Sequence, residues 1–319
     1  MSSHQEKLLG SMLRIRYVEE TIAERYAEQE MRCPTHLCIG QEGIAVGVCD
    51  VLARRDKVFS NHRAHGHYLA KGGDLNAMIA ELYGRVTGCC GGRGGSMHLI
   101  DLDVSFMGAT PIVGGTVPIA VGSAWASSLQ KHDQVTVVFF GDGCFEEGVM
   151  HESLNFSALH KLPIVFICEN NNFSVYTPLK LRQPQRPIHT LAAAHGLTAT
   201  AGDGNDVEQV RALAMQAVEA ARAGEGPQFL ELSTFRWREH CGPNFDHELN
   251  YRPAAEIEAG LADCPIERYK AAMGKYGVDV VPLLDRLEIK LRQEIDLAFA
   301  FSDQSANPLP IAALDKLYA

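Results

Sequence analysis

An aspartate and an asparagine follow two apolar runs in the middle of the chain, and both residue types are oxygen ligands for a cation. Asp142 lies within Gly-Asp-Gly directly after VTVVFF, and Asn171 lies within Asn-Asn-Asn shortly after LPIVFIC. Residues 144–169 separate the two motifs, which is enough chain for a crossover helix and a return strand. Because ligands of parallel sheets bind beyond the carboxyl ends of the strands, we expect the two side chains side by side at one sheet edge.

This pair of side chains suits Mg²⁺ bound to a diphosphate. Mg²⁺ prefers six oxygens and commonly uses one or two carboxylate-type ligands together with phosphates and water. Gly141 and Gly143 would let the backbone approach the phosphates, and the N-terminal amides of the next helix would face the anion. Either motif alone is more often an ordinary turn, so the prediction depends on their order, spacing and strand context.

The surrounding pattern predicts a doubly wound α/β fold, a parallel sheet with flanking helices. Strands are predicted at 135–140, 162–168 and 229–235, and such apolar runs suit a sheet that is covered on both faces. Helices are predicted at 6–30, 75–83, 154–160, 205–223, 267–276 and 282–301. Asn205 is predicted to cap its helix, with Glu208 as capping-box partner. The glycine-rich stretch 84–122 predicts tight turns or backbone close to a ligand.

Composition indicates one globular domain over residues 1–319, with helical extensions at both ends. The formal net charge is −10, with 46% hydrophobic and 21% charged residues, so neither nucleic acid nor an anionic membrane is expected as partner. No apolar run approaches the ~18 residues of a membrane-spanning helix, and the N-terminus lacks a signal-peptide pattern. With nine cysteines, an odd number that suits free thiols, a cytoplasmic chain is expected.

Further motifs across the chain are similar to those of one enzyme family. They are HLCIGQEG at 36–43, HRAHGH at 62–67, GGRGGSMH at 91–98, IVGGTVPIAVG at 112–122, ENNNFS at 169–174, PIERY at 265–269 and EIDLAFAF at 294–301. Together with GDG and the later NN, which resemble a thiamine diphosphate-binding motif, they make nearly the whole chain resemble α subunits of thiamine diphosphate-dependent 2-oxo acid (pyruvate-type) and acetoin dehydrogenases. The resemblance implies the thiamine diphosphate-binding fold.

The resemblance implies thiamine diphosphate and Mg²⁺ as cofactors. Asp142, Asn171 and the backbone carbonyl of Phe173 would bind Mg²⁺. The other cofactor contacts would come from His62, Arg63, Val113, Gly143, Cys144 and His240. A guanidinium suits the diphosphate because it is planar and donates parallel hydrogen bonds. The chain departs from the family pattern at His62, where many relatives carry tyrosine, and at Pro111, where they often carry glycine.

Three histidines are the catalytic candidates. His240 matches the histidine of the family's mobile active-site loop, where it would transfer a proton or stabilise charge near the lipoyl group. Without the resemblance, His240 would be taken for a surface histidine. His36 and His65 match other family histidines near the active centre. Cys241 replaces the serine that is phosphorylated in animal relatives, so regulation by a kinase at this position is not expected.

The implied activity is decarboxylation of a pyruvate-like 2-oxo acid and transfer of the acyl group to a lipoyl acceptor. The implied partners are a β subunit in an α₂β₂ assembly, which would supply a glutamate to the cofactor, and a lipoylated acyltransferase. The loop REHCGPN (238–244) keeps two alternatives open, an acetoin dehydrogenase α subunit and a specialised thiamine diphosphate enzyme of a biosynthetic pathway. A catalytically inactive regulatory homologue is the non-enzyme alternative. A small metal site at Cys33, His36 and Cys38 is a weaker reading, because no second ligand pair with zinc spacing follows.

Overall fold

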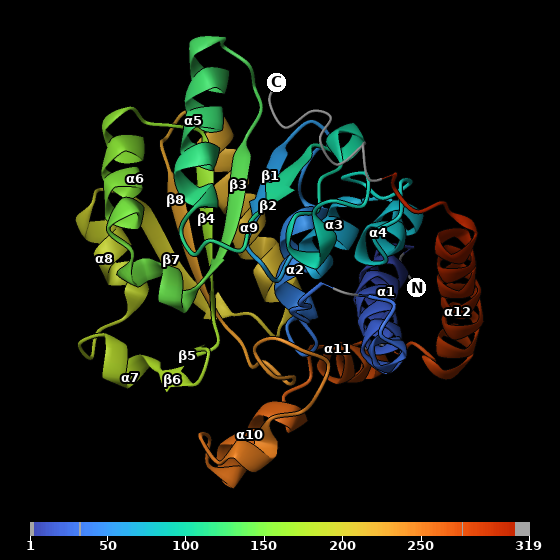
Figure 1. The fold of residues 1–319 in the computed structure, drawn as a ribbon. Helices are drawn as coiled ribbons and strands as arrows, with labels where there is room; N and C mark the ends of the chain where they lie inside the picture. Colours follow the sequence, from blue (N-terminus) through green and yellow to red (C-terminus); the bar gives the residue numbers. More distant parts are fainter. Residues whose placement is uncertain (1–2, 32, 276, 310–319) are drawn as a thin grey trace.

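A six-stranded, all-parallel sheet lies at the centre of the computed structural model, which describes residues 3–31, 33–275 and 277–309 (Figure 1). The strand order is β2-β1-β3-β4-β8-β7. The strands are β1 Lys57–Ser60, β2 Phe106–Ala109, β3 Thr136–Gly141, β4 Ile164–Asn170, β7 Thr198–Asp203 and β8 Gln228–Ser233. A small antiparallel pair, β5 Phe173–Ser174 and β6 Thr177–Pro178, follows β4. The predicted α/β class is confirmed.

Helices cover both faces of the sheet (Figure 1). One face carries α1 Ser3–Arg25, α2 Glu42–Asp50, α3 His65–Lys71, α4 Leu75–Leu82, α9 Val207–Arg222, α11 Pro265–Lys275 and α12 Val281–Gln304. The other carries α5 Thr116–Leu129, α6 Gly148–Leu159 and α8 Ile188–Ala194, while α7 Leu179–Arg182 and α10 Ala254–Ala262 lie farther out. Alternation along β3 explains the two layers, because Val137 and Phe139 enter one apolar core and Val138 and Phe140 the other.

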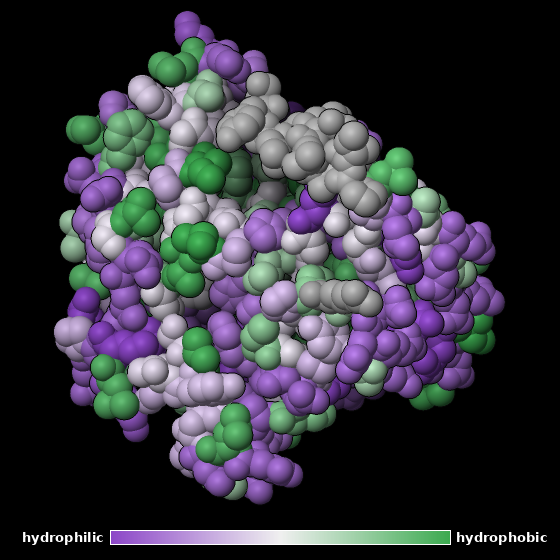
Figure 2. Space-filling view, in the orientation of Figure 1, coloured by the Kyte–Doolittle hydropathy of each residue, from purple (hydrophilic) through white to green (hydrophobic). Residues whose placement is uncertain are grey.

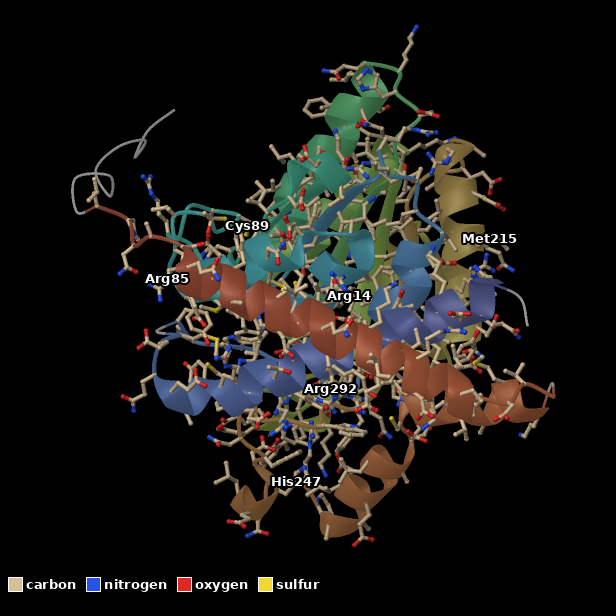
Figure 3. The ribbon with its side chains drawn as sticks, turned by 90° about the vertical axis from the view of Figure 1, so that its right-hand side faces the viewer. Arg14, Arg85, Cys89, Met215, His247 and Arg292 are labelled. Atoms are coloured by element: carbon tan, nitrogen blue, oxygen red, sulfur yellow. The ribbon has the colours of Figure 1, made fainter. Side chains whose placement is uncertain are left out.

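The last described helix, α12, lies along α1 (Figure 3). Arg14 of α1 pairs with Glu294 of α12, with 2.7 Å between Nη2 and Oε1. Leu287 and Leu291 are buried beneath α12 in the same core as Leu8 and Met12 of α1. The first and the last described helices, α1 and α12, therefore pack against each other on one side of the sheet. Within the described ranges, no helix is both long and apolar enough to cross a membrane.

The predicted helices and strands with strong apolar patterns are present in the structure, and elements with weak patterns were not predicted. All three predicted strands are present within two residues of the expected bounds, and α1, α4, α9, α11 and α12 match predicted helices. The helix at 154–160 begins earlier, at Gly148, and Tyr276 lies outside the described residues. Asn205 does not cap α9, because the cap is Asp206, whose carboxylate accepts from the Glu208 and Gln209 amides.

Most of the shorter elements were not expected. Among the strands these are β1, β2, β5, β6 and the edge strand β7, which reads TATAGD without a large apolar side chain. Among the helices they are α2, α3, α5, α7, α8 and α10. The end of the glycine-rich stretch 84–122 is the start of helix α5. Gly115 directly precedes this helix, and Gly122 lies on its exposed side. Tight turns therefore describe only the first part of that stretch.

Candidate active site

The carboxyl ends of β1, β3 and β4 surround one cavity of about 760 Å³, its open mouth included. Its wall is formed by Gln41, Asn61, His62, Arg63, Ile112, Val113, Gly114, Thr116, Phe140, Gly141, Asp142, Gly143, Cys144, Glu169, Asn171, Phe173, Ser174, Val175, Arg236 and His240. The structure thus brings together Asp142, Asn171, Arg63, His62 and His240, which lie far apart in the sequence.

The turn after β3 leaves room for backbone to approach a ligand. It is a short 3₁₀ helix, Asp142–Glu146, in which the side chains of Asp142 and Cys144 are buried. A Cβ atom added to Gly143 would lie 2.8 Å from Ser174 Oγ and 3.0 Å from its Cβ, so the Ser174 side chain would have to move. Glycine is therefore favoured at this position, where the resemblance places a diphosphate amide.

Asp142 is buried and already faces a positive charge. Its exposed fraction is 1%, and burial raises the pKa of its carboxyl group, while Arg182 opposes that shift. Arg182 Nη2 donates to Asp142 Oδ2, and Arg182 Nη1 donates to Glu146. A cation that binds Asp142 must displace this guanidinium or share the carboxylate with it. No local pattern pointed to Arg182, because Asp142, its partner, lies 40 residues away in the sequence.

The Asn171 amide lies among polar groups that are incompletely satisfied. Its Nδ2 donates to Gln41 Oε1 at 3.2 Å, and its Oδ1 accepts from the Phe173 amide at 3.2 Å. Gln41 is 2% exposed, and its Nε2 finds no hydrogen-bond partner among the described residues. Because an orphaned buried donor costs about 1–3 kcal/mol, this atom points to an acceptor supplied by a ligand. Sequence reasoning did not identify Gln41.

Arg63 is a buried cation whose direct partners are neutral. Its Nη1 donates to the Leu37 carbonyl and its Nη2 to the His240 carbonyl, the latter at 3.2 Å. Within the described part of the chain, no carboxylate lies at ion-pair distance from it. Burial, followed by the nearby charge of Arg236, lowers the pKa of Arg63 to about 10. An unpaired buried charge is costly, so the geometry favours an anion in this cavity.

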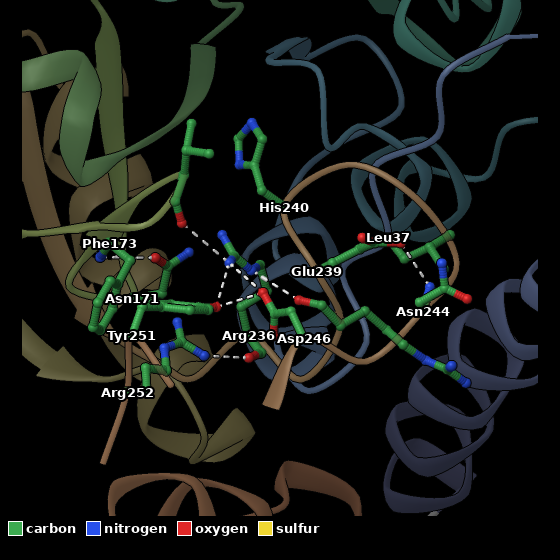
Figure 4. A network of polar contacts seen from close by, with 12 residues as sticks. Leu37, Asn171, Phe173, Arg236, Glu239, His240, Asn244, Asp246, Tyr251 and Arg252 are labelled. Atoms are coloured by element: carbon green, nitrogen blue, oxygen red, sulfur yellow. Dashed lines mark hydrogen bonds and ion pairs between the residues drawn. The ribbon is translucent and has the colours of Figure 1, made fainter. Parts of the chain in front are cut away.

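Arg236 organises the loop that carries His240 (Figure 4). Its Nη2 donates to Tyr251 Oη at 3.0 Å and to the Val175 carbonyl at 3.3 Å, and it lies 3.5 Å from Asp246 Oδ2. Arg236 is 1% exposed. The network holds the irregular segment that carries His240 against the cavity. The His240 ring itself points away from the network of Arg236 (Figure 4). Arg236 was another residue without a sequence signal.

Three imidazoles gather beside Arg63. The His36 and His62 ring centroids are 4.6 Å apart, those of His36 and His240 5.1 Å, and those of His62 and His240 5.2 Å. Burial, followed by the charge of Arg63, lowers the pKa of His36 to about 3, of His62 to about 2 and of His240 to about 3. All three rings are therefore neutral near pH 7, and each is a weak base as long as the Arg63 charge beside it is not offset.

The other predicted site residues differ in how they relate to the cavity: His36 and His65 are not among the residues that line it, and Val113 lies at its rim. His65 is fully buried outside the cavity wall, with Nδ1 3.2 Å from Glu19 Oε1 and Nε2 2.8 Å from Ser96 Oγ. Since Glu19 also accepts from the Cys38 amide, His65 is placed to hold the loop that carries His36. Val113 lines the cavity but is 45% exposed at its rim.

The residues present fit a metal-bound diphosphate. Carboxylate and amide oxygens lie at adjacent strand ends, and the Asp142 turn has a glycine on each side of the carboxylate. Two buried guanidinium groups and an orphaned amide donor face the same cavity. Oxygen ligands suit Mg²⁺, and guanidinium groups suit phosphate oxygens.

Comparison with known proteins gives the class of the chain. The Dehydrogenase E1 component family matches residues 10–311. The α subunit of acetoin:2,6-dichlorophenolindophenol oxidoreductase from Bacillus subtilis is 37% identical over 100% of this chain and 95% of that protein. The pyruvate dehydrogenase E1 component subunit alpha of Zymomonas mobilis is 34% identical over 96% of this chain and 85% of that protein. The chloroplastic pyruvate dehydrogenase E1 subunit alpha-3 of Arabidopsis thaliana is 36% identical over 98% of this chain and 74% of that protein.

The chain belongs to the Dehydrogenase E1 component family. The identification made from the sequence motifs is thereby confirmed at the level of the family and its class, a thiamine diphosphate-dependent oxidoreductase.

Proposed function

We propose that this chain is the α subunit of an enzyme that decarboxylates a pyruvate-like 2-oxo acid and transfers the acyl group to a lipoyl acceptor. The observation that carries the proposal is the buried Arg63, which has no carboxylate at ion-pair distance among the described residues and shares its cavity with Asp142 and Asn171. Asp142, Asn171 and the Phe173 carbonyl would hold Mg²⁺. Arg63, the Gly143 and Cys144 amides and Gln41 would hold the diphosphate.

The histidines supply the proton chemistry in this proposal. When bound, thiamine diphosphate would supply a nucleophilic thiazolium carbon and an electron sink for the charge left by decarboxylation. A bound diphosphate would also offset the Arg63 charge that helps to lower the pKa of His240, which lines the cavity, and of His36 beside it, so that either ring could exchange a proton with a substrate hydroxyl or an incoming thiol. The hydrogen bond from Arg63 to the His240 carbonyl fixes the backbone that carries this ring.

A second subunit would complete the site. Ile112 and Val113 at the cavity rim are 69% and 45% exposed, and Ile119, Trp125 and Leu129 of α5 are exposed as well. Figure 2 shows apolar, green surface on the side of the molecule where Figure 1 places α5. An exposed apolar surface of this kind is typical of a protein interface. We propose that a β subunit covers it in an α₂β₂ assembly and supplies the glutamate that activates the cofactor. A lipoylated acyltransferase would receive the acyl group.

Acetoin oxidation is the second candidate function. It is supported by the 37% identity to the α subunit of an acetoin:2,6-dichlorophenolindophenol oxidoreductase, which spans the whole chain. The site residues serve both substrates, because cofactor binding and proton transfer are common to the two reactions. The nine free cysteines suit a reducing compartment, and we propose the cytoplasm.

A substrate panel separates the two candidates. The chain is assembled with its β subunit, loaded with Mg²⁺ and thiamine diphosphate, and given pyruvate, longer and branched 2-oxo acids, or acetoin. Turnover is read as reduction of 2,6-dichlorophenolindophenol, with Asp142→Asn in the same assembly as the inactive control. Preference for a 2-oxo acid supports the first function and preference for acetoin the second. A cofactor-saturated assembly that turns over none of these substrates would refute both.

A further inference from the structure

The His36, His62 and His240 rings, which we call the imidazole cluster, form a potential ligand set apart from the Asp142–Asn171 pair. One nitrogen from each ring lies within 4.8 Å of the others. The rings come from three separate loops, before α2, after β1 and after β8. Three imidazole nitrogens with an open fourth position are a common arrangement around Zn²⁺.

We propose that the imidazole cluster binds one divalent transition-metal ion of the Zn²⁺ class through the three ring nitrogens, with water as fourth ligand. Tetrahedral zinc with bonds of about 2.0–2.1 Å needs nitrogens about 3.4 Å apart. The observed separations therefore require the rings to close by about 1.4 Å at most, which side-chain rotations supply.

A second observation points to a ligand at this place. His36 is 7% exposed, and its Nδ1 is buried without a hydrogen-bond partner in the described part of the chain. A buried ring nitrogen without a partner is costly, and a metal ion would satisfy it. This orphaned nitrogen is separate from the carboxylate and amide oxygens that would bind Mg²⁺.

The three loops are held together before any metal arrives. The Gly242 amide donates to the Thr35 carbonyl at 2.8 Å, and the Trp237 amide donates to the Ile39 carbonyl at 3.2 Å. Arg63 binds the carbonyls of Leu37 and His240, one on each loop. The backbone that carries His36 and His240 is therefore preorganised, which lowers the entropic cost of binding an ion.

The charge of Arg63 sets a limit on the affinity. Its guanidinium lies beside the cluster and repels a dication, while Glu19 and Glu169 offset part of that repulsion. We therefore expect weaker zinc binding than in sites that include a carboxylate ligand. Imidazole ligands without carboxylates also favour Zn²⁺ over Mg²⁺ and Ca²⁺.

His62 and His240 line the cavity proposed for the cofactor, so an ion here would obstruct it. This consequence depends on the proposed function, but binding of the ion does not. A failure of metal binding would leave the cofactor proposal intact, and a failure of cofactor binding would leave the metal site intact.

The test is a zinc titration of the assembled, cofactor-free protein, with a chromophoric chelator as competitor. We expect one Zn²⁺ per chain, and a loss of affinity of at least about 100-fold in His62→Tyr and in His240→Ala. His195→Asn is the matched control, because His195 and His151 form another close imidazole pair, with 3.2 Å between ring nitrogens. That variant should bind Zn²⁺ as the parent does.

Cobalt(II) in place of zinc gives a second readout, because visible bands of low-coordinate cobalt should appear in the parent and vanish in His62→Tyr. Two variants of the cluster guard against a folding defect in one of them, which circular dichroism would reveal. Absence of stoichiometric binding would overturn the proposal. Binding that is lost in Asp142→Asn but retained in both cluster variants would equally overturn it, by placing the ion at the carboxylate.

Discussion

Two glycine-rich segments of this chain differ in whether the chain itself supplies an anion to the hydrogen-bond donors around them. In the first, residues 88–95, the Glu81 carboxylate accepts from four backbone amides, those of Cys90, Gly92, Gly94 and Gly95, at 2.7–3.0 Å. In the second, the turn at Gly141–Gly143 and its surroundings, Asp142 and Glu169 line the cavity but pair with Arg182 and His67, so Arg63 and the Gln41 amide nitrogen have no anionic partner among the described residues.

The difference separates a structural site from a binding site. Glu81 is 1% exposed and each of its oxygens accepts two amides, so this loop is complete in itself. Around Arg63, buried donors and charge are left for a ligand, which costs stability in its absence. Changes in the first segment should therefore affect folding, and changes in the second should affect binding.

Arg63→Met should give the largest effect on binding with little change in stability. Removal of the guanidinium should weaken binding of Mg²⁺ with thiamine diphosphate at least about 100-fold, since a buried charge pair is lost. The free energy of unfolding without cofactor should change little, because removal of an unpaired buried charge offsets the loss of the hydrogen bonds to the Leu37 and His240 carbonyls. Calorimetric binding and urea unfolding measure the two effects. A destabilised variant with normal binding would reverse the comparison.

Glu81→Gln should show the opposite pattern. The neutral amide cannot accept from four backbone amides as the carboxylate does, so the free energy of unfolding should fall by about 2–4 kcal/mol. Glu24→Gln on the exposed side of α1 is the control and should change it by less than about 0.5 kcal/mol. Urea unfolding decides, and equal midpoints for the two variants would show that the carboxylate does not hold this loop.

His62→Gln should reduce the acid sensitivity of folding. In the folded chain, burial keeps the pKa of His62 at about 2, whereas in the unfolded chain it lies near 6.5. Below about pH 6.5 the unfolded chain therefore binds the extra proton, and the free energy of unfolding falls as the pH falls, by about 1.4 kcal/mol per unit for one histidine.

The measurement is urea unfolding between pH 6 and 5 in the presence of a chelator. The slope against pH should be smaller in His62→Gln by about one proton. His132→Gln, at an exposed position, should keep the parental slope. An unchanged slope in His62→Gln would mean that this ring is not held neutral by the fold.

Arg182→Gln should have the smallest effect and the reverse sign. Arg182 donates a hydrogen bond to the Asp142 carboxylate, so its removal would free this carboxylate to bind Mg²⁺. Cofactor affinity at fixed Mg²⁺ should therefore rise by about 3- to 10-fold. Thr177→Ala, a change in β6 directly before α7, is the control. Arg182 Nε donates to the backbone carbonyl of Thr177 and not to its side chain, so the substitution leaves this hydrogen bond in place. Weaker binding in Arg182→Gln would instead make this guanidinium a ligand of the diphosphate.

The sequence revealed the parts of the site that are encoded locally. Asp142, Asn171 and Arg63 belong to motifs in which a few neighbouring residues define the role. The strongly apolar β3 and β4 place Asp142 and Asn171, whereas Arg63 follows the short β1, which the sequence did not reveal. Gln41 and Arg182 take part through contacts 130 and 40 residues away in sequence, for which periodicity and spacing carry no signal. The edge strand β7 was missed because its residues are small and polar, and its pairing with β8 is what makes it a strand.

Binding of thiamine diphosphate to Asp142→Asn, titrated with Mg²⁺ in the assembled protein, tests the central claim most directly. The account predicts saturable, Mg²⁺-dependent binding in the parent and a loss of at least about 100-fold in the variant, with unchanged circular dichroism. Equal affinity in the two proteins, or parental binding that is indifferent to Mg²⁺, would contradict the assignment of this cavity as a metal diphosphate site.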